Sequence, residues 1–306
     1  MEKPGHIQRR TDLAVEAHEL WRESAATETL LNGVRAKEHT CEGMTVTTVE
    51  ILDEQGAAEL DKPIGKYITV ELNGLARWEP EVFGRACRAV AEQLRSLIKV
   101  GDGDTILVAG LGNRAITPDS IGPLCCESVM VTRHLVERMP GDFGHMRPVA
   151  AITPGVLGTT GMESAEILCG VIKKAAPKAV IMIDALASRK LDRLCRTVQL
   201  SDTGIVPGSG VGNARAALNA DTMGVPVISV GVPTVVDAAT LAADISQAAG
   251  FGEIAPEELS RYSGGLIVTP KEIDSQVHEI ARVIGYAVNL AAQRDISVED
   301  ITGYLA

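Results

Sequence analysis

The order of apolar and polar residues along the chain has two periods, and each period predicts one kind of element. Short runs rich in Val, Ile and Leu predict buried strands, whereas apolar residues spaced three or four apart predict helices that pack by one face. The predicted strands are residues 44–52, 67–72, 105–110, 149–153, 179–184, 225–230 and 266–269. The predicted helices are residues 80–98, 121–139, 161–175, 213–221, 238–248 and 271–293, after a first helix that begins at residue 13.

From residue 105 onward the predicted strands and helices alternate. This order is typical of a largely parallel sheet covered by helices on both faces. With 306 residues, 45% of them hydrophobic, the chain has enough apolar side chains for one large core. The sequence therefore predicts an α/β fold, a single domain with a mixed, largely parallel sheet, in which residues 44–52 and 67–72 are neighbouring strands.

The first residues are polar, and we expect residues 1–12 to form a loose extension of a domain that comprises residues 13–306. Thr11 and Asp12 are of the residue types that cap helices, so they are expected at the N-cap of the first helix.

Composition and charge exclude several classes of protein. The formal charge of −11 and the aromatic content of 3% disfavour direct binding of nucleic acid, which uses basic surfaces and stacking side chains. The N-terminus has no leader-like apolar segment and no run is long enough to cross a bilayer, so we expect a soluble cytoplasmic protein without a membrane partner. The six cysteines form no C-x-x-C pair, which predicts buried free thiols in a reducing compartment.

Two aspartates stand beyond apolar runs, at the ends where open α/β sheets collect ligands and catalytic groups. Asp119 follows the predicted strand 105–110, and Asp184 closes the predicted strand 179–184. Either aspartate alone is explained by helix capping. Together, next to glycine-rich segments and without a competing nucleophile, Asp119 and Asp184 predict an acid/base pair.

Two glycine-rich segments flank this pair. The segment 110–115 has the G-x-G-x-x-A form of a dinucleotide site, but Thr117-Pro118 delays the following helix, which disfavours a nucleotide-binding oxidoreductase. Residues 207–213 offer backbone N–H groups to an anion or oxyanion before a predicted helix. Backbone donors for an oxyanion are therefore expected at Gly110, Gly112 and Asn113 or at Gly208, Gly210 and Gly212.

The other motifs in the sequence do not indicate a particular catalytic or metal site. Asp202-Thr203-Gly204 copies the motif of pepsin-like proteases, but a single copy in an α/β pattern is better explained as a turn whose aspartate accepts backbone N–H bonds. The six histidines are scattered and match no metal-binding spacing, and a serine-hydrolase elbow is lacking. We therefore expect neither a metal nor a cofactor.

A series of motifs in one order, spanning the whole chain, resembles the germination proteases of endospore-forming bacteria, endopeptidases that degrade small acid-soluble spore proteins. The matching motifs are Arg10-Thr11-Asp12-Leu13-Ala14-Val15-Glu16, Gly110-Leu111-Gly112-Asn113, Thr117-Pro118-Asp119-Ser120-Ile121-Gly122-Pro123, Thr153-Pro154-Gly155-Val156-Leu157-Gly158-Thr159-Thr160-Gly161, Ile183-Asp184-Ala185-Leu186-Ala187, Ser201-Asp202-Thr203-Gly204 and Pro207-Gly208-Ser209-Gly210-Val211-Gly212-Asn213.

The resemblance implies an atypical aspartic-type protease whose catalytic carboxylates are Asp119 and Asp184. It implies a phosphorylase/hydrolase-like fold similar to hydrogenase-maturation peptidases, a homotetramer, and action in the forespore or spore core. It also implies a zymogen that cleaves itself at Asp12-Leu13, so that residues 1–12 are a propeptide and residues 13–306 the catalytic domain.

The mechanism expected for such a pair is that two close carboxylates share one proton, because both cannot readily ionise. The ionised aspartate activates water and the protonated one assists the peptide carbonyl, and the sequence leaves open which is which. The extension is expected to block the cleft until a fall in pH permits cleavage. The alternatives are a metal-dependent maturation peptidase, which needs a metal bound by carboxylates and a histidine, and a non-catalytic spore protein.

Overall fold

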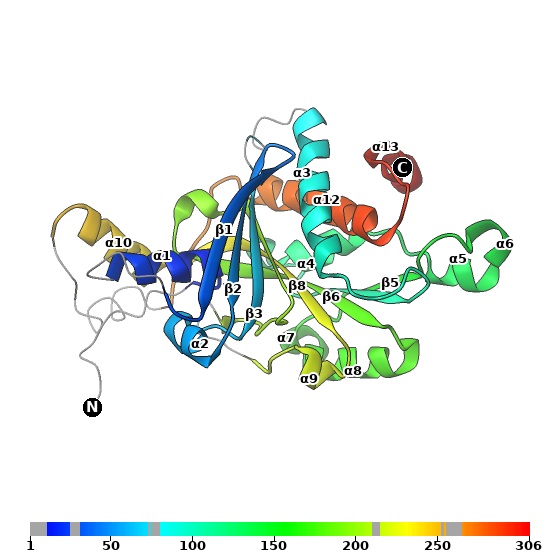
Figure 1. Cartoon of the computed structure of the whole chain (residues 1–306), viewed down its shortest axis with the longest axis horizontal. Helices are drawn as coiled ribbons and strands as arrows, with labels where there is room; N and C mark the ends of the chain where they lie inside the picture. The colour runs from blue at the N-terminus through cyan, green and yellow to red at the C-terminus, as the bar shows by residue number, and fades with distance from the viewer. Residues whose placement is uncertain are drawn as a thin grey trace.

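A mixed sheet runs through the molecule in the computed structural model, which describes residues 11–24, 31–72, 74, 80–209, 215–251, 254 and 265–306 (Figure 1). Within these residues the strand order is β1-β2-β3-β7-β8-β6-β4-β5, and β9 pairs with β8. The strands are β1 (Val34–Cys41), β2 (Met44–Ile51), β3 (Gly65–Glu71), β4 (Ile106–Gly110), β5 (Val149–Ile152), β6 (Ala179–Ser188), β7 (Thr197–Ser201), β8 (Val227–Asp237) and β9 (Ile267–Val268).

The sheet has two halves with different pairing. Strands β8, β6, β4 and β5 are parallel, whereas β1, β2, β3 and β7 pair antiparallel with one another and with β8. The predicted α/β class is confirmed, and its parallel part lies in the region where strands and helices alternate. The predicted neighbours β2 and β3 are confirmed as an antiparallel pair.

Helices cover both faces of the sheet, as predicted. They are α1 (Ala14–Ser24), α2 (Glu54–Leu60), α3 (Pro80–Leu97), α4 (Ile121–Glu127), α5 (Arg133–Arg138), α6 (Pro140–Phe143), α7 (Leu157–Thr160), α8 (Ser164–Ala175), α9 (Ala220–Met223), α10 (Ala238–Ala248), α12 (Ile273–Ala292) and α13 (Val298–Leu305), with short 3₁₀ turns η2 (Thr117–Asp119) and η3 (Leu191–Arg193).

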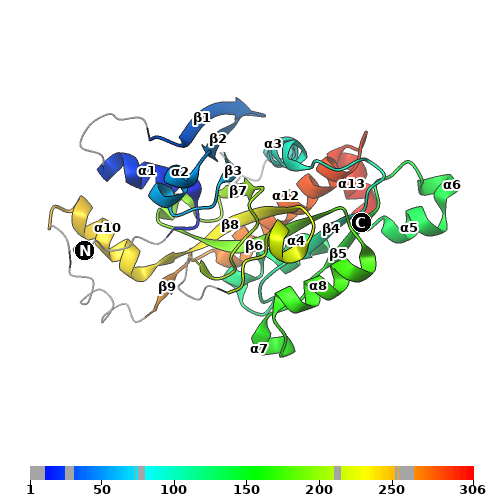
Figure 2. The same ribbon diagram turned by 60° about the horizontal axis from the view of Figure 1, so that its bottom comes forward.

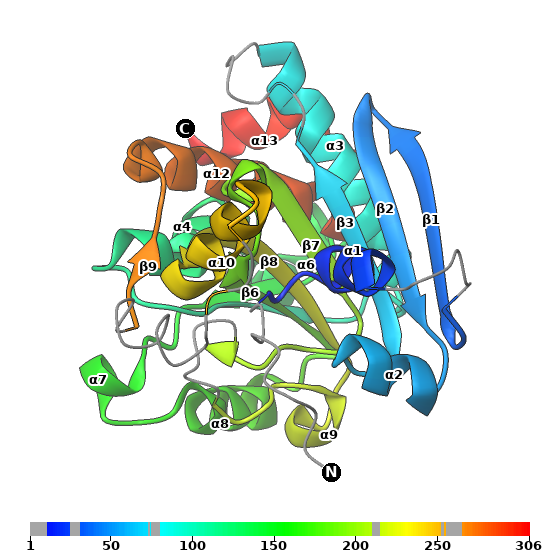
Figure 3. The same cartoon turned by 90° about the vertical axis from the view of Figure 1, so that its left-hand side faces the viewer.

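Strand β6 shows how one run of residues serves both faces. Successive side chains of a strand point to opposite faces, so Ile181 and Ile183 enter the core with α3, α4 and α12, whereas Val180 and Met182 pack with α8 and α9. Figure 2 shows α8 against the parallel half, and Figure 3 shows α1 and α2 over the antiparallel half, where they pack on β2 and β3. Because both faces are buried, the first five residues of β6, Ala179 to Ile183, are all apolar.

The predicted helix over residues 121–139 is wrong, because tertiary hydrogen bonds replace helical ones. Helix α4 ends at Glu127, and Asn289 of α12 then accepts the N–H of Met130 at 2.8 Å and donates to the carbonyl of Ser128 at 2.8 Å. The Thr132 hydroxyl donates to the Arg147 carbonyl before α5 begins. A distant side chain thus ends a helix that the local pattern would continue.

Three further expectations need correction. Strands β1 and β7 were not predicted: β1 is an edge strand of mostly exposed polar residues, and β7 contains only five residues. The predicted helix 213–221 is wrong where it is described, since only Ala220–Met223 is helical there. Of the six free cysteines, Cys41, Cys87, Cys125 and Cys195 are buried as expected, but Cys169 is exposed. None of the described helices is long and apolar enough to span a bilayer.

Candidate active site

Asp184 lies within a strand, which corrects the expectation that it closes one. Strand β6 continues to Ser188 and pairs with β8 along this length, whereas its other neighbour, β4, ends at Gly110 opposite Ile183. The pleat turns Asp184 toward the face that carries α8 and α9. Its side chain is 5% exposed, and its Oδ1 accepts the N–H of Ala185 at 2.9 Å.

Asp119 belongs to the short turn η2, between β4 and α4. Its Oδ2 accepts the N–H of Asn113 at 2.8 Å, and the Thr234 hydroxyl of β8 donates to the Pro118 carbonyl at 2.7 Å. The turn is therefore fixed to the strand beside β6. Neither Asp119 nor Asp184 caps a helix, so the capping interpretation fails for both.

Two glycines allow this close packing. Gly112 has φ +105°, and a Cβ there would lie 2.1 Å from the Asp119 carbonyl oxygen. A Cβ on Gly122 would lie 2.2 Å from the Leu111 carbonyl oxygen and 2.6 Å from that of Ile183. Glycine at both positions lets η2 and α4 approach the end of β4 and the middle of β6, which brings Asp119 to Asp184.

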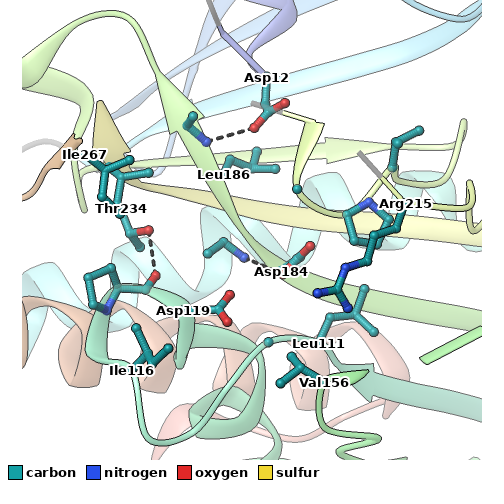
Figure 4. A pocket seen from close by; sticks show the side chains of 18 of the residues that line it. Asp12, Leu111, Ile116, Asp119, Val156, Asp184, Leu186, Arg215, Thr234 and Ile267 are labelled. Atoms are coloured by element: carbon teal, nitrogen blue, oxygen red, sulfur yellow. Dashed lines mark hydrogen bonds between the residues drawn. The ribbon is translucent and has the colours of Figure 1, made fainter. Parts of the chain in front are cut away.

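The two carboxylates face one cavity of about 240 Å³. Figure 4 shows Asp119 and Asp184 at one end of it with the Arg215 guanidinium beside them, and Asp12 at the other end beyond Leu186. The remaining lining residues are Leu111, Gly112, Ile116, Pro118, Val156, Ser164, Ala185, Ala187, Val206, Pro207, Gly208, Thr234, Val235 and Ile267.

The electrostatics of the two aspartates differ. The pKa of Asp184 is raised from 3.8 to about 8, chiefly by burial and in addition by the negative charges of Asp119 and Asp12, against the Ala185 N–H and Arg215. Burial also raises the pKa of Asp119, but the Asn113 N–H and Arg215 oppose this. The two shifts therefore favour the proton of the pair on the more buried Asp184 and the negative charge on Asp119.

Asp12 is tied to the same cavity. Its N–H donates to the Ala187 carbonyl at 2.9 Å, and its Oδ2 accepts the Ala187 N–H at 2.8 Å. Its Oδ1 accepts the Ser209 hydroxyl at 2.8 Å. The predicted N-cap role of Asp12 is therefore wrong, because its carboxylate is turned to β6 and to the loop after β7. Described residues 11 and 12 are docked rather than loose, and residues 1–10 lie outside the described part.

Thr11 links the start of α1 to a buried carboxylate. Its hydroxyl donates to Glu16 Oε2 at 2.5 Å and accepts the N–H of Leu13 at 3.0 Å. Glu16 and Leu13 are both 0% exposed, and Glu16 also accepts the N–H groups of Arg189 and Lys190. Burial raises the pKa of Glu16 despite these donors.

A larger cavity of about 760 Å³ adjoins the first and shares Asp12, Leu186 and Val206 with it. It lies between α1 and the loops that flank β7, and Lys62 donates from its wall to the Thr11 carbonyl at 3.2 Å. The two cavities therefore lie next to each other at these three residues, and the carboxylate pair lines only the smaller one.

The predicted backbone donors are only partly in the site. Gly112 and Gly208 line the cavity, whereas Gly110 packs against the Gly122 backbone, and the Asn113 N–H is bound to Asp119. Gly210 and Gly212 lie outside the described residues. Asp202 accepts a backbone N–H, as its turn interpretation requires, but that of Lys66 on β3.

Sequence reasoning missed Gln199, Arg215 and Thr234, and it gave no separate role to Ser209. Arg215 lies just beyond the glycine-rich segment 207–213, which was its one signal. Thr234 of β8 lines the smaller cavity and Gln199 of β7 lines the larger one, and only the fold brings these two strand residues there. Within the described residues, no group of three or more His, Cys, Asp or Glu side chains could hold a metal ion.

Comparison with known proteins finds a family model and relatives that match this chain. The family model described as germination protease matches residues 14–249. The germination protease of Clostridium tetani is 42% identical over 97% of this chain and 99% of its own length, and that of Clostridium perfringens is 43% identical over 97% and 98%. The Bacillus cytotoxicus germination protease is 36% identical over 96% of both chains.

Among solved structures, the hydrogenase maturation protease HycI of Thermococcus kodakarensis aligns with 64% of this chain and 98% of its own, at 17% identity and a TM-score of 0.35. A score this low carries no argument. The family match and the relatives, which align along nearly their whole lengths, show that the chain belongs to the germination proteases, peptidases of spore germination.

Proposed function

We propose that the chain is an aspartic-type endopeptidase that begins the degradation of small acid-soluble spore proteins during germination. The main observation in support is that Asp119 and Asp184 face one cavity and that their pKa values differ, that of Asp184 being raised to about 8. Carboxylates held in different protonation states by their surroundings are suited to acid and base roles in one reaction.

The protonation states assign the roles. Asp119, the anion, takes a proton from a water molecule as the water attacks the scissile carbonyl carbon. Protonated Asp184 donates a hydrogen bond to the carbonyl oxygen and stabilises the charge that develops there. As the tetrahedral intermediate collapses, the C–N bond breaks and the amine leaves with the proton that Asp119 accepted. Arg215 supplies a positive charge beside both carboxylates, as its lowering of both pKa values indicates.

The same proposal includes self-processing at Asp12-Leu13. Asp12 lines the cavity that holds the pair, so the chain's own segment occupies the place that a substrate must enter. In this arrangement the N-terminal segment blocks the cavity, and its removal opens the cavity to other proteins. Assembly as a homotetramer remains a prediction, which sedimentation equilibrium of the full chain would check.

The test is cleavage of a small acid-soluble spore protein by the full chain, with products and loss of residues 1–12 mapped by mass. Asp119→Asn and Asp184→Asn should each lower both cleavages by about a thousandfold or more, as expected for loss of a proton-transfer group. Asp202→Asn is the matched control, because Asp202 binds Lys66 on β3. The dyad would be wrong if either variant kept a tenth of the wild-type rate. Inhibition by a chelator would favour the metal-dependent alternative.

A further inference from the structure

The cavity at the carboxylate pair is acidic, although negative charge must develop in it during cleavage. Asp12, Asp119 and Asp184 all line it, and of the described residues that line it only Arg215 is cationic. When water attacks, Asp119 takes a proton and the negative charge moves to the oxygen of the scissile carbonyl. Such an oxyanion is stabilised by hydrogen-bond donors that already face the place where it forms.

The backbone N–H groups closest to the pair are already bound within the protein. The Leu111 N–H donates to a carbonyl of β6 at 2.8 Å. The Asn113 N–H donates to Asp119 at 2.8 Å. The Ala185 N–H donates to Asp184 at 2.9 Å. These three donors hold the site together, so a side-chain donor is the next candidate for the oxyanion.

Arg215 reaches into the cavity from the segment between β7 and α9. Its backbone N–H donates to the Pro207 carbonyl at 3.0 Å, which fixes the base of the side chain. Figure 4 shows its guanidinium beside Asp184, and its positive charge lowers the pKa of both Asp119 and Asp184. The guanidinium therefore lies close enough to act on the reacting groups.

The contacts of this guanidinium leave donors for a third group. Among the described residues, the one ion pair of Arg215 is with Glu163, whose Oε2 lies 3.6 Å from Nη1, so neither catalytic aspartate is paired with it. A guanidinium carries five N–H donors in a planar fork, and Glu163 engages one of its three nitrogens. The N–H groups of Nε and Nη2 are thus not used by Glu163.

Glu163 holds Arg215 from the rim of the cavity. It is the N-cap residue of α8, and its neighbour Ser164 lines the cavity. The side chains of Glu163 and Arg215 are 41% and 30% exposed, so the ion pair lies at the surface and joins two walls of the cavity. This arrangement keeps the guanidinium over the carboxylates without covering them.

We propose that Arg215 is a third catalytic residue, which donates hydrogen bonds to the oxyanion of the tetrahedral intermediate together with Asp184, and that Glu163 positions its guanidinium. This inference rests on the proposed function. Arg215 keeps all of its protons, because a guanidinium does not deprotonate in proteins. It forms and breaks no covalent bond, and the leaving amine still receives the proton that Asp119 accepted from water.

The first test is the rate at which the full chain carrying Arg215→Met cleaves itself at Asp12-Leu13. The cleaved segment is part of the chain, so affinity for a separate substrate does not enter this rate. We expect a fall of about a hundredfold, the scale for removal of one oxyanion donor. Arg215→Lys keeps the charge without the fork and should recover about tenfold of this loss. Arg114→Met is the matched control, because Arg114 pairs with Glu127 and does not line the cavity.

The positioning role of Glu163 is tested through Arg215. Glu163→Gln should slow self-cleavage by about threefold, because exposed ion pairs contribute little. In the Arg215→Met chain the same change should have no further effect. Glu127→Gln, at the partner of Arg114, is the control and should have no effect in either chain. Equal losses from Glu163→Gln in both chains would show that Glu163 acts on α8 and not through Arg215.

The pH profile of self-cleavage separates a catalytic role from a structural one. Because Arg215 lowers the pKa of Asp119 and of Asp184, Arg215→Met should move both limbs of the profile to higher pH. Arg215→Lys should leave both limbs in place. Asp12, which raises the pKa of Asp184, is present in every variant. A slower reaction with unmoved limbs would show that the guanidinium does not lie beside the pair during catalysis.

Cleavage of a small acid-soluble spore protein by the processed chains distinguishes the remaining outcomes. Arg215→Met should lower kcat with little change in KM, because the contact forms only in the transition state. A raised KM with unchanged kcat would instead make Arg215 a substrate-binding residue and overturn the proposal.

Asp119→Asn and Asp184→Asn are measured alongside. If both are inactive while Arg215→Met keeps a third of the wild-type rate, this inference alone fails. If Arg215→Met is inactive while the aspartate variants stay active, the proposed dyad fails and Arg215 remains the oxyanion donor. A wild-type chain that cleaves neither itself nor the spore protein would overturn both.

Discussion

The two ends of the cavity are held by different kinds of contact. At the dyad end, formed by Asp119, Asp184 and Gly112, the backbone is packed so closely that a single Cβ would lie 2.1 Å from a carbonyl oxygen. At the Asp12 end, formed by Asp12, Ala187 and Ser209, the contacts are hydrogen bonds to an open strand edge and to an exposed loop serine. Close packing therefore fixes Asp119 beside Asp184, whereas Asp12 is held by hydrogen bonds, so a change at Asp12 leaves the packing at the other end in place.

The largest loss of activity is expected from Gly112→Ala, which tests whether packing holds the dyad end of the cavity. The added methyl group must displace Asp119, because a Cβ would meet its carbonyl oxygen at 2.1 Å and its Oδ1 at 2.9 Å. We expect peptidase activity to fall by about a hundredfold, the scale of a misplacement of about 1 Å. Gly158→Ala is the control, because a Cβ there meets nothing within 4 Å. Equal activity of the two variants would show that Asp119 is not held by packing.

A smaller loss is expected from Thr234→Val, which removes the hydroxyl that binds the Pro118 carbonyl at 2.7 Å. Because this bond fixes the turn that carries Asp119, kcat should fall by about fivefold, with less change in KM, since the loss of one such bond costs about 1 kcal/mol. Thr234→Ser keeps the hydroxyl and should recover most of the rate. Failure of serine to rescue would attribute the effect to packing instead.

The pH profile of cleavage should be bell-shaped. Activity should fall in acid as Asp119 gains a proton, and it should fall in alkali as Asp184 loses one near its pKa of about 8. Asp12→Asn removes a negative charge that raises the pKa of Asp184, so the alkaline limb for added peptide should move to lower pH. An unmoved limb would show that the two ends of the cavity do not interact electrostatically.

A further expected effect is on stability rather than on activity. The folded chain keeps on Asp184 a proton that the unfolded chain releases at its ordinary pKa of 3.8, so this group lowers stability as pH rises from about 4 toward about 8. Asp184→Asn removes that cost and should raise the free energy of unfolding at pH 8 but hardly at pH 4, because each pKa unit of the shift is worth about 1.4 kcal/mol. Chemical denaturation at both pH values measures it. A similar gain at both would contradict the raised pKa.

The sequence predicted the parallel half of the fold and singled out Asp119 and Asp184, which the fold brings to one cavity, because apolar runs and the polar residues beside them are local signals. It could not predict that β6 continues past Asp184, since Ala185 to Ser188 are not a strong strand signal and extend only because β8 pairs with them. It likewise overextended the helix after Ile121, which Asn289 interrupts from a distant helix. The role of Gln199 could not be predicted, because one polar residue in a five-residue strand gives no sequence signal and only the fold brings it to the larger cavity.

The Thr11 hydroxyl links the Leu13 N–H to the Glu16 carboxylate. Cleavage after Asp12 would therefore change the charges around Glu16. Hydrolysis would turn the Leu13 amide into a free α-ammonium group at the first turn of α1, where the helix dipole disfavours positive charge. Glu16 stands one hydroxyl away from that nitrogen, and the hydroxyl would depart with the cleaved segment. Before the cut, buried Glu16 accepts a hydrogen bond from the neutral Thr11 hydroxyl. After the cut, Glu16 would face the positively charged α-ammonium group of Leu13. The folded chain therefore already contains the counter-ion for its new N-terminus.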